Sequence, residues 1–183
     1  MNISVVIPNY NGEELLRKNL PKIFEAISAY KEGPSEIIVA DDASADNSIN
    51  QLRNLMIRMN SQYPKVKFRI IKNKKNLGFS SNVNKGAANA DGDVIVLLNT
   101  DVMPNKDFLN PLLSHFKDEN IFAAGCMDKS IENGKVTLRG RGIGFWKRGF
   151  LRLALTEWEV QGAVHRASIL CGTECLRKRR RAP

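Results

Sequence analysis

Short apolar segments alternate with segments of helical periodicity along most of the chain, and this alternation constrains the fold most. Four apolar runs predict buried strands, at residues 3–7, 36–40, 66–71 and 93–98. Helical spacing follows the first three of them, at residues 13–30, 46–59 and 79–90. Because the connections are short, the pattern predicts an α/β fold with a mostly parallel (mixed) sheet flanked by helices on both faces.

Proline residues and a loss of periodicity mark the less certain stretches of this pattern. Pro21 lies inside the first helical segment, so a kink or a break is expected there. A further helix is predicted over 104–117 and a fifth short strand over 121–126. Beyond these the pattern weakens, apart from a candidate strand at 136–138. We therefore divide the chain into a core, residues 1–127, and an irregular region with a basic tail, residues 128–183.

The composition is that of a globular domain. The 183 residues are 43% apolar and 26% charged, which excludes disordered and collagen-like classes. No apolar stretch is long enough to span a bilayer, and the first apolar run ends before Pro8 with no charged region ahead of it. A cytoplasmic location is therefore predicted. Cys126, Cys171 and Cys175 form no zinc pattern with the two histidines and are interpreted as reduced thiols.

The net charge of +9 comes in large part from five consecutive basic residues at 177–181. The smaller excess that remains suits a domain that binds a diphosphate ligand or approaches an anionic membrane, and equally a solvated lysine-rich surface. The tail has no interleaved aromatic residues and no nucleic-acid-binding motif accompanies it. Nucleic acid is therefore not a predicted partner.

Polar residues follow three of the predicted strands at the point where each ends. They are Pro8 to Asn11, then Asp41 and Asp42, then Asn99 to Asp101. In open α/β sheets, ligands bind beyond the carboxyl ends of the strands, so these groups are the candidate site. For Asp41 we favour a ligand role, with its carboxylate accepting hydrogen bonds from a base or from ribose hydroxyls. For Asp42 we favour a turn or helix-capping role.

Two further segments supply candidate binding groups. Asp101 offers a hard oxygen ligand for Mg²⁺ or Mn²⁺, which are commonly held by one or two carboxylates plus substrate phosphates. An ordinary turn is the alternative interpretation of the segment 99–101. In the segment from Asn76 to Asn82, Gly78 can adopt a positive φ, and the amides of the following helix could face an anion.

Several catalytic and binding motifs are absent from the sequence. There is no G-x-G-x-x-G after the first strand and no P-loop, which removes the main support for dinucleotide and P-loop classes. No G-x-S-x-G elbow occurs, and neither histidine has a serine or cysteine nucleophile in a recognisable context. A receiver-like signalling domain is disfavoured because Lys72 and Asn73, and no aspartate, follow the third strand. A nucleotidyltransferase is disfavoured because residues 8–12 contain no basic side chain.

Four motifs in order give the chain a family resemblance. V-V-I-P-N-Y-N-G at 5–12, I-I-V-A-D-D-A-S at 37–44, N-L-G-F at 76–79 and L-L-N-T-D-V at 97–102 resemble the inverting family 2 glycosyltransferases, in particular rhamnosyltransferase-like members. The resemblance covers about residues 1–127. It implies the nucleotide-diphospho-sugar transferase fold (GT-A, Rossmann-like). It also implies transfer of a sugar from a nucleotide-diphosphate sugar donor to an acceptor hydroxyl, with inversion and assistance from Mn²⁺ or Mg²⁺.

The resemblance also implies roles for individual residues. Asp101 looks like the metal-binding aspartate of the family's D-x-D motif, with Asn99 at its first position. Asp41 is expected to meet the nucleobase. The donor-binding residues implied as a set are Pro8, Tyr10, Asn11, Asp41, Asn76, Gly78, Asn82 and Asn99.

The second part of the chain departs from the family pattern. Residues 160–163 and 171–178 are both similar to the segment that follows the metal motif in family members. No later acidic motif follows to supply the general base, and neither Glu157, Glu159 nor Glu174 has a spacing that recommends it. The catalytic base is therefore unassigned. We interpret residues 128–183 as an incomplete acceptor-side region and the chain as a truncated or frameshifted member.

Two functions follow as hypotheses. The first is an active glycosyltransferase that uses a saccharide or lipid-linked acceptor in cell-surface polysaccharide biosynthesis, with peripheral contact at the inner membrane face. The second is a non-catalytic remnant that binds a nucleotide sugar without turning it over. Donor binding without transfer in the presence of manganese would favour the remnant.

Overall fold

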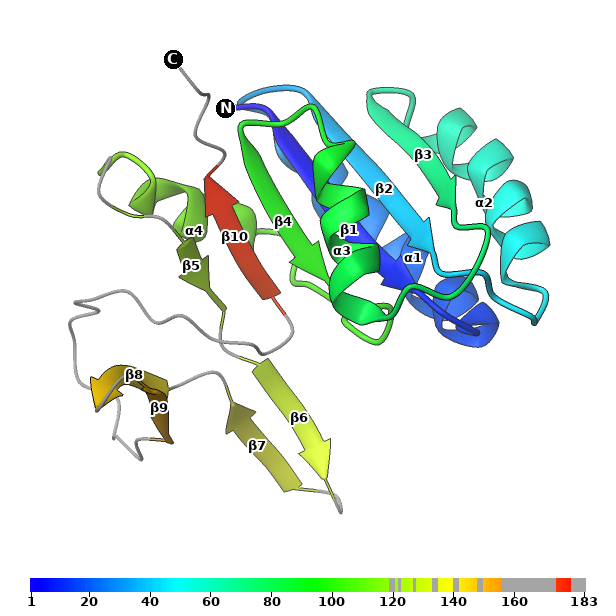
Figure 1. The fold of residues 1–183 in the computed structure, drawn as a ribbon. Helices are drawn as coiled ribbons and strands as arrows, with labels where there is room; N and C mark the ends of the chain where they lie inside the picture. Colours follow the sequence, from blue (N-terminus) through cyan, green and yellow to red (C-terminus); the bar gives the residue numbers. More distant parts are fainter. Residues whose placement is uncertain are drawn as a thin grey trace.

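The computed structural model describes residues 1–118, 121, 123–126, 128–132, 135–139, 142–147, 150–155 and 174–178 (Figure 1). This part of the chain is built on a six-stranded sheet with the order β3-β2-β1-β4-β10-β5. The strands are β1 (Ile3–Asn9), β2 (Ser35–Asp41), β3 (Val66–Lys72), β4 (Val94–Leu98), β5 (Ala123–Gly125) and β10 (Glu174–Lys178). The first four are parallel, and β10 is antiparallel to both β4 and β5. The predicted mixed, mostly parallel sheet is confirmed.

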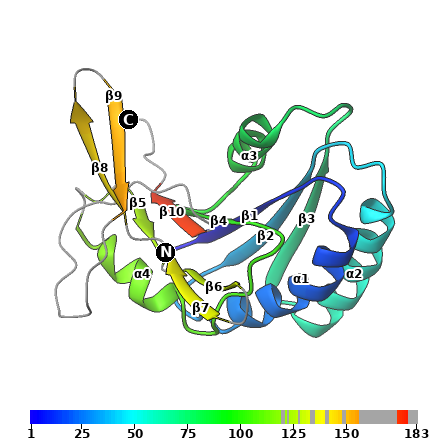
Figure 2. The same cartoon turned by 90° about the horizontal axis from the view of Figure 1, so that it is seen from below.

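Helices cover both faces of the sheet, as Figure 2 shows for α3 on one side and α1 and α2 on the other. The helices are α1 (Glu13–Ser28), α2 (Ser48–Gln62), α3 (Phe79–Ala88) and α4 (Leu109–His115). Among the described residues, none of these helices has the length and apolar character needed to cross a membrane.

Alternate residues of each strand face the two helical layers, which gives two separate cores. Val5 and Val39 pack with Phe24 of α1 in the larger cluster, to which α2 and α4 also contribute. Val6 and Ile38 belong to the smaller cluster on the α3 face. The period of two along a strand causes this division, and it also decides which strand-end residues reach which side of the sheet.

At Pro21 the helix has no break, and the helix predicted from residue 104 starts later than expected. Pro21 lies within a single helix, α1, because a proline removes one backbone hydrogen bond while the buried face, including Leu20 and Phe24, continues on both sides of it. The helix predicted over 104–117 begins only at Leu109. Leu109 and Leu113 are buried in the core and Phe108 packs against it in part, but residues 105–107 are exposed polar side chains with no packing that would stabilise a helix.

The region after residue 127 contains more regular structure than predicted. It forms two hairpins, β6 (Asp128–Glu132) with β7 (Lys135–Arg139), and β8 (Gly142–Lys147) with β9 (Phe150–Leu155). The candidate strand at 136–138 falls within β7. Residues 174–178, for which no strand was predicted, form β10 between β4 and β5 in the main sheet.

A buried carboxylate holds the sheet together at the edge opposite the candidate site. Glu36, 4% exposed, accepts hydrogen bonds from Ser4 Oγ (2.6 Å) and the Asp91 backbone N–H (2.7 Å). It also pairs with the Arg69 guanidinium at 3.2 Å. The backbone N–H of Gly92 in turn donates to Ser4 Oγ at 2.7 Å. This network joins β1, β2, β3 and the turn before β4 through one charged group.

Candidate functional site

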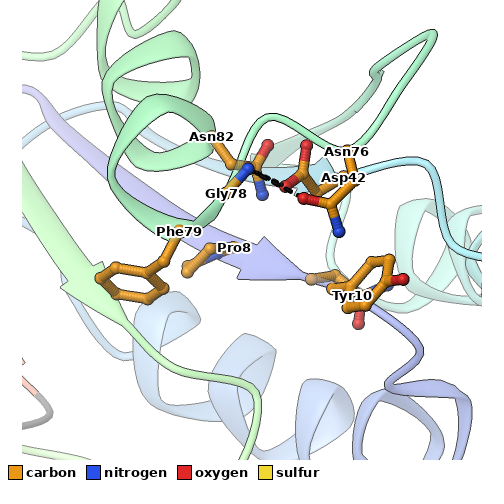
Figure 3. A pocket seen from close by; sticks show the side chains of 8 residues that line it. Pro8, Tyr10, Asp42, Asn76, Gly78, Phe79 and Asn82 are labelled. Atoms are coloured by element: carbon orange, nitrogen blue, oxygen red, sulfur yellow. Dashed lines mark hydrogen bonds between the residues drawn. The ribbon is translucent and has the colours of Figure 1, made fainter.

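A cavity of about 190 Å³ lies beyond the carboxyl ends of β1 and β2, beside the start of α3 (Figure 3). Complete small-molecule sites span roughly 300–1,000 Å³, so this cavity can take only one part of a larger ligand. Its lining residues are Pro8, Asn9, Tyr10, Asp42, Asn76, Gly78, Phe79 and Asn82. The position is the one where ligands bind in open α/β sheets.

Asp42 is the charged residue of the cavity wall. It is 3% exposed, and its Oδ1 accepts hydrogen bonds from the Leu77 N–H and from Asn73 Nδ2, both at 2.8 Å. Its Oδ2 accepts one from the Gly78 N–H at 2.9 Å. Burial acts to raise the pKa of Asp42, but these hydrogen bonds and the nearby Lys85 charge together hold the pKa below its usual value. Asp42 is therefore a buried anion that fastens the 76–78 loop to the end of β2.

A hydrogen-bond network of asparagine side chains holds Asp42 in place. Asn73 donates through Nδ2 both to Asp42 and to Asn82 Oδ1 (2.9 Å), and accepts from Lys85 Nζ at 2.6 Å. Asn82 in turn donates to the Ala40 carbonyl at 2.7 Å. Asn73 and Asn82 are both buried, so their hydrogen bonds fix the start of α3 against β2.

Asp41, expected from the sequence to meet the ligand, does not line the cavity. It is fully buried and accepts hydrogen bonds from Asn9 Nδ2 (2.8 Å), Ser44 Oγ (2.5 Å) and the Ser44 N–H (3.1 Å). The reason is strand periodicity, since residues of β2 alternate between the two faces and the cavity lies on the α3 side with Asp42. The structure thus assigns the internal role to Asp41 and the cavity to Asp42.

Two exposed aromatic rings belong to the cavity wall. Tyr10 is 55% exposed and Phe79 is 61% exposed, and in the view of Figure 3 the side chain of Pro8 lies between them. Apolar rings left in water beside a cavity are suited to stacking on a planar ligand. Asn9 and Phe79 fall within the predicted segments 8–11 and 76–79, but neither was among the residues individually predicted to bind the donor. A large apolar residue at the first position of a polar helix was the available signal for Phe79.

Asn11 also lies outside the residues that line the cavity, and it organises the neighbouring loops instead. Its backbone has a positive φ of 51°, its N–H donates to Ser44 Oγ at 2.9 Å, and its Oδ1 accepts from the Ala45 N–H at 2.8 Å. It thereby joins the loop after β1 to the loop after β2. Ala43, in the second of these loops, has a φ of 59°. A side chain makes this left-handed conformation unfavourable.

Replacing Ala43 with glycine is expected to raise the free energy of unfolding by about 0.5–1 kcal/mol, since glycine adopts a positive φ without strain. Urea unfolding followed by circular dichroism measures the change. Ala45→Gly is the matched control, because Ala45 lies in the same loop and has no positive φ. That control should leave stability unchanged or lower it. Equal effects of the two substitutions would contradict the strain at Ala43.

The loop after β4 carries the predicted metal ligand. Asp101 is exposed and Asn99 is half-buried, and neither lines the cavity. The Val102 N–H donates to the Asn99 carbonyl at 3.3 Å, and Asn19 Nδ2 of α1 donates to the Thr100 carbonyl at 2.8 Å. Because β1 and β4 are adjacent and parallel, this loop lies on the same sheet edge as the cavity.

The donor set around Asp101 can be tested against the requirements of a divalent cation. Within the described residues, no group of three or more histidine, cysteine, aspartate or glutamate side chains forms a metal site. Mg²⁺ and similar ions often take one carboxylate from the protein and the remaining oxygen ligands from substrate phosphates and water. A single exposed carboxylate on the same sheet edge as the cavity fits that mode of binding and does not fit an all-protein cage.

Of the residues predicted to bind the donor, five line one cavity. They are Pro8, Tyr10, Asn76, Gly78 and Asn82. The structure places Asn11, Asp41 and Asn99 outside its lining and adds Asn9, Asp42 and Phe79. The parallel sheet with helices on both faces and a polar site at its carboxyl edge is the nucleotide-diphospho-sugar transferase (GT-A) type of fold.

The sequence profile of glycosyl transferase family 2 matches residues 4–171, and the chain belongs to this family. A dolichol-phosphate mannosyltransferase of Pyrococcus furiosus is 32% identical over 137 residues, which cover 74% of this chain and 35% of that protein. An undecaprenyl-phosphate 4-deoxy-4-formamido-L-arabinose transferase of Proteus mirabilis is 35% identical over 100 residues, 55% of this chain and 29% of that protein. The matches span about a third of each of these relatives.

Solved structures show the same fold. The mannosyltransferase PcManGT from Pyrobaculum calidifontis, in complex with GDP-Man and Mn²⁺, superposes with a TM-score of 0.58 at 23% identity, covering 72% of this chain and 36% of that one. S. aureus TarS (residues 1–349) in complex with UDP gives a TM-score of 0.54 at 19% identity, covering 67% and 34%. At these identities the likeness concerns the fold.

Proposed function

We propose that this chain binds a nucleotide-diphosphate sugar at the carboxyl edge of its sheet and transfers the sugar to an acceptor, with inversion and with help from Mn²⁺ or Mg²⁺. The observation that carries the proposal is the cavity in which the buried Asp42 carboxylate lies with two exposed aromatic rings, on the same sheet edge as the Asp101 loop. Membership of glycosyl transferase family 2 supports the same reaction class.

In this proposal the nucleobase occupies the cavity. The Asp42 carboxylate already accepts three hydrogen bonds, and a carboxylate has about four lone-pair sites. One site is left for an N–H of the base, which uracil, thymine and guanine all possess. Tyr10 and Phe79 would contribute by stacking on the planar base. Asp42 thus takes the role that the sequence assigned to Asp41.

The diphosphate would lie toward Asp101, which would hold the divalent cation together with the phosphate oxygens. When bound, the cation supplies Lewis-acid stabilisation of the charge that develops on the diphosphate leaving group. Asn99, in the same loop, would border the donor. The general base that deprotonates the acceptor is assigned to no residue of this chain.

The names of two relatives specify dolichol phosphate and undecaprenyl phosphate. We therefore favour a lipid-linked acceptor over a free saccharide, and with it peripheral contact with the inner membrane face. The transferred group would be a hexose or a deoxyhexose such as rhamnose, used in a cell-surface polysaccharide. A chain that binds the donor and transfers nothing is the alternative hypothesis.

Calorimetric titration with UDP, dTDP and GDP, each with and without Mn²⁺, tests the proposal. One of the three nucleotides should bind at least tenfold more tightly with Mn²⁺, and Asp101→Ala should remove that gain because it removes the carboxylate that shares the cation. Asp107→Ala, a second exposed aspartate six residues further on, is the matched control and should keep the gain.

The outcomes separate the two hypotheses. Metal-dependent binding followed by sugar transfer to a polyprenyl phosphate supports the enzyme. Metal-dependent binding without transfer to lipid or saccharide acceptors supports the non-catalytic binder. A folded chain that binds none of the three nucleotides would overturn the proposal.

A further inference from the structure

Asn19 is a polar residue on the apolar face of α1. It is 3% exposed, and the neighbouring Leu16, Leu20 and Ile23 on the same helix are buried in the core. Its Nδ2 donates to the backbone carbonyl of Thr100 at 2.8 Å. Its Oδ1 is buried and has no hydrogen-bond partner among the described residues.

A buried asparagine with an unpaired Oδ1 is not expected to increase the stability of the fold. A buried amide oxygen without a partner costs more free energy than one neutral hydrogen bond typically returns. A leucine at this position would fill a similar volume and would carry no unsatisfied atom into the core. Any advantage of asparagine over leucine at this position must therefore come from the loop residue that its single hydrogen bond holds in place.

The hydrogen bond holds the peptide next to Asp101. The carbonyl of Thr100 is the acceptor, and the turn is closed on its other side by the Val102 N–H donating to the Asn99 carbonyl. The contact joins residues 81 positions apart, from α1 to the loop after β4. These two hydrogen bonds fix the residues on either side of Asp101. Because Asp101 itself is exposed, its carboxylate remains accessible.

A second link between α1 and the same stretch of chain provides a comparison. Lys106 Nζ pairs with Glu25 at 2.7 Å, but the lysine side chain is 73% exposed and lies five residues beyond Asp101. Exposed ion pairs of this kind contribute little and are screened by salt. The partly buried hydrogen bond from Asn19 to Thr100 is thus the link next to Asp101.

We propose that Asn19 is a positioning residue for the cation-binding loop, fixing the Thr100 carbonyl so that the Asp101 carboxylate is preorganised for a divalent cation shared with the donor diphosphate. Asn19 does not touch the cation or the donor. The inference rests on the proposed function, since it concerns the cation and donor named there. Preorganisation raises affinity because less ordering of the loop remains to be done on binding.

The test compares Asn19→Leu with the natural chain. The variant should melt at the same or a higher temperature. Its Mn²⁺-dependent nucleotide affinity should fall three- to tenfold, while binding without metal stays unchanged. Amide hydrogen exchange at Asp101 and Val102, measured without any ligand, should become faster. Lys106→Met is the matched control and should alter none of these quantities.

Each outcome decides the inference. Unchanged metal dependence and unchanged exchange in Asn19→Leu would overturn the positioning role while leaving the donor site intact. If Asn19→Leu fails to fold, Asn19→Ala, which leaves room for water at the Thr100 carbonyl, replaces it with the same expected results for binding and exchange and with a lower melting temperature. Absence of Mn²⁺-dependent binding in the natural chain would overturn the proposed function, and the inference with it.

Discussion

Replacing Asp42 with asparagine is expected to weaken nucleotide binding by about tenfold to a hundredfold, the loss that corresponds to hydrogen bonds with a charged group. Three donors point at its carboxylate, from Asn73, Leu77 and Gly78. An asparagine has one acceptor oxygen, so its amide N–H groups would face at least one of these donors. The 76–78 loop would lose part of its attachment to residue 42, and the cavity would lose an acceptor proposed for the base.

Calorimetry with the nucleotide that the natural chain binds best measures this effect. Asp107→Asn is the matched control, because it makes the same chemical change at an exposed position away from the cavity. Thermal melting of both variants checks that the fold persists. Wild-type affinity in folded Asp42→Asn would refute a role for Asp42 in the donor site and would leave Asp41 as the carboxylate predicted to meet the base.

Replacing Arg69 with methionine is expected to lower the free energy of unfolding by about 2–3 kcal/mol. Glu36 is 4% exposed and the Arg69 side chain 30% exposed, so the substitution leaves a buried carboxylate without its cationic partner. Breaking a fully buried pair costs about 3–5 kcal/mol. We lower the expected value because almost a third of Arg69 is in contact with water, which screens the interaction.

Urea unfolding measures this loss, and a neighbouring residue supplies the control. Lys67 lies two positions earlier on β3 and pairs with Asp91 at 3.0 Å, with both side chains more than 60% exposed. Lys67→Met should therefore change stability by less than about 1 kcal/mol. Glu36→Gln combined with Arg69→Met should recover part of the loss, because the unpaired charge is then gone. Equal losses for Lys67→Met and Arg69→Met would contradict a buried role for the pair.

Much of the sheet could be predicted from the sequence because its strands are apolar runs and its helices have regular apolar spacing. The positions of Pro8 and Tyr10 followed from the rule that ligands bind at the carboxyl ends of parallel strands. Gly78 was predicted separately, from a positive φ at the start of a helix and from the family resemblance. The strands, the helices and the strand-end residues depend on local sequence and on general topology, and both can be inferred from the amino-acid sequence.

The choice between Asp41 and Asp42 could not be made in the same way. Adjacent residues at the end of a strand point to opposite faces, so the choice depends on which face α3 covers. The face that α3 covers is a feature of the tertiary structure, and the two adjacent aspartates carry no signal of it. The supporting roles of Asn73 and Asn19 are of the same kind, since their partners lie far away in the sequence.

The strand at residues 174–178 was not predicted, and the reason is different. β10 has five residues, of which Arg177 and Lys178 are basic, and a segment so short and so charged has no apolar run to mark it as a strand. Its position is set by pairing with β4 and β5, which are distant in the sequence. The pairing of β10 with these strands is a property of the tertiary structure and leaves no local signal in the sequence.

The insertion of β10 between β4 and β5 has a consequence for the order in which the protein assembles. The four parallel strands and their helices can form from the first part of the chain, but one edge of β4 then exposes unpaired backbone groups until residues 174–178 arrive. Contacts between segments so far apart form slowly, because a long loop must close first. During synthesis, that open edge is the place where another strand, including one from a second nascent chain, can bind in place of β10.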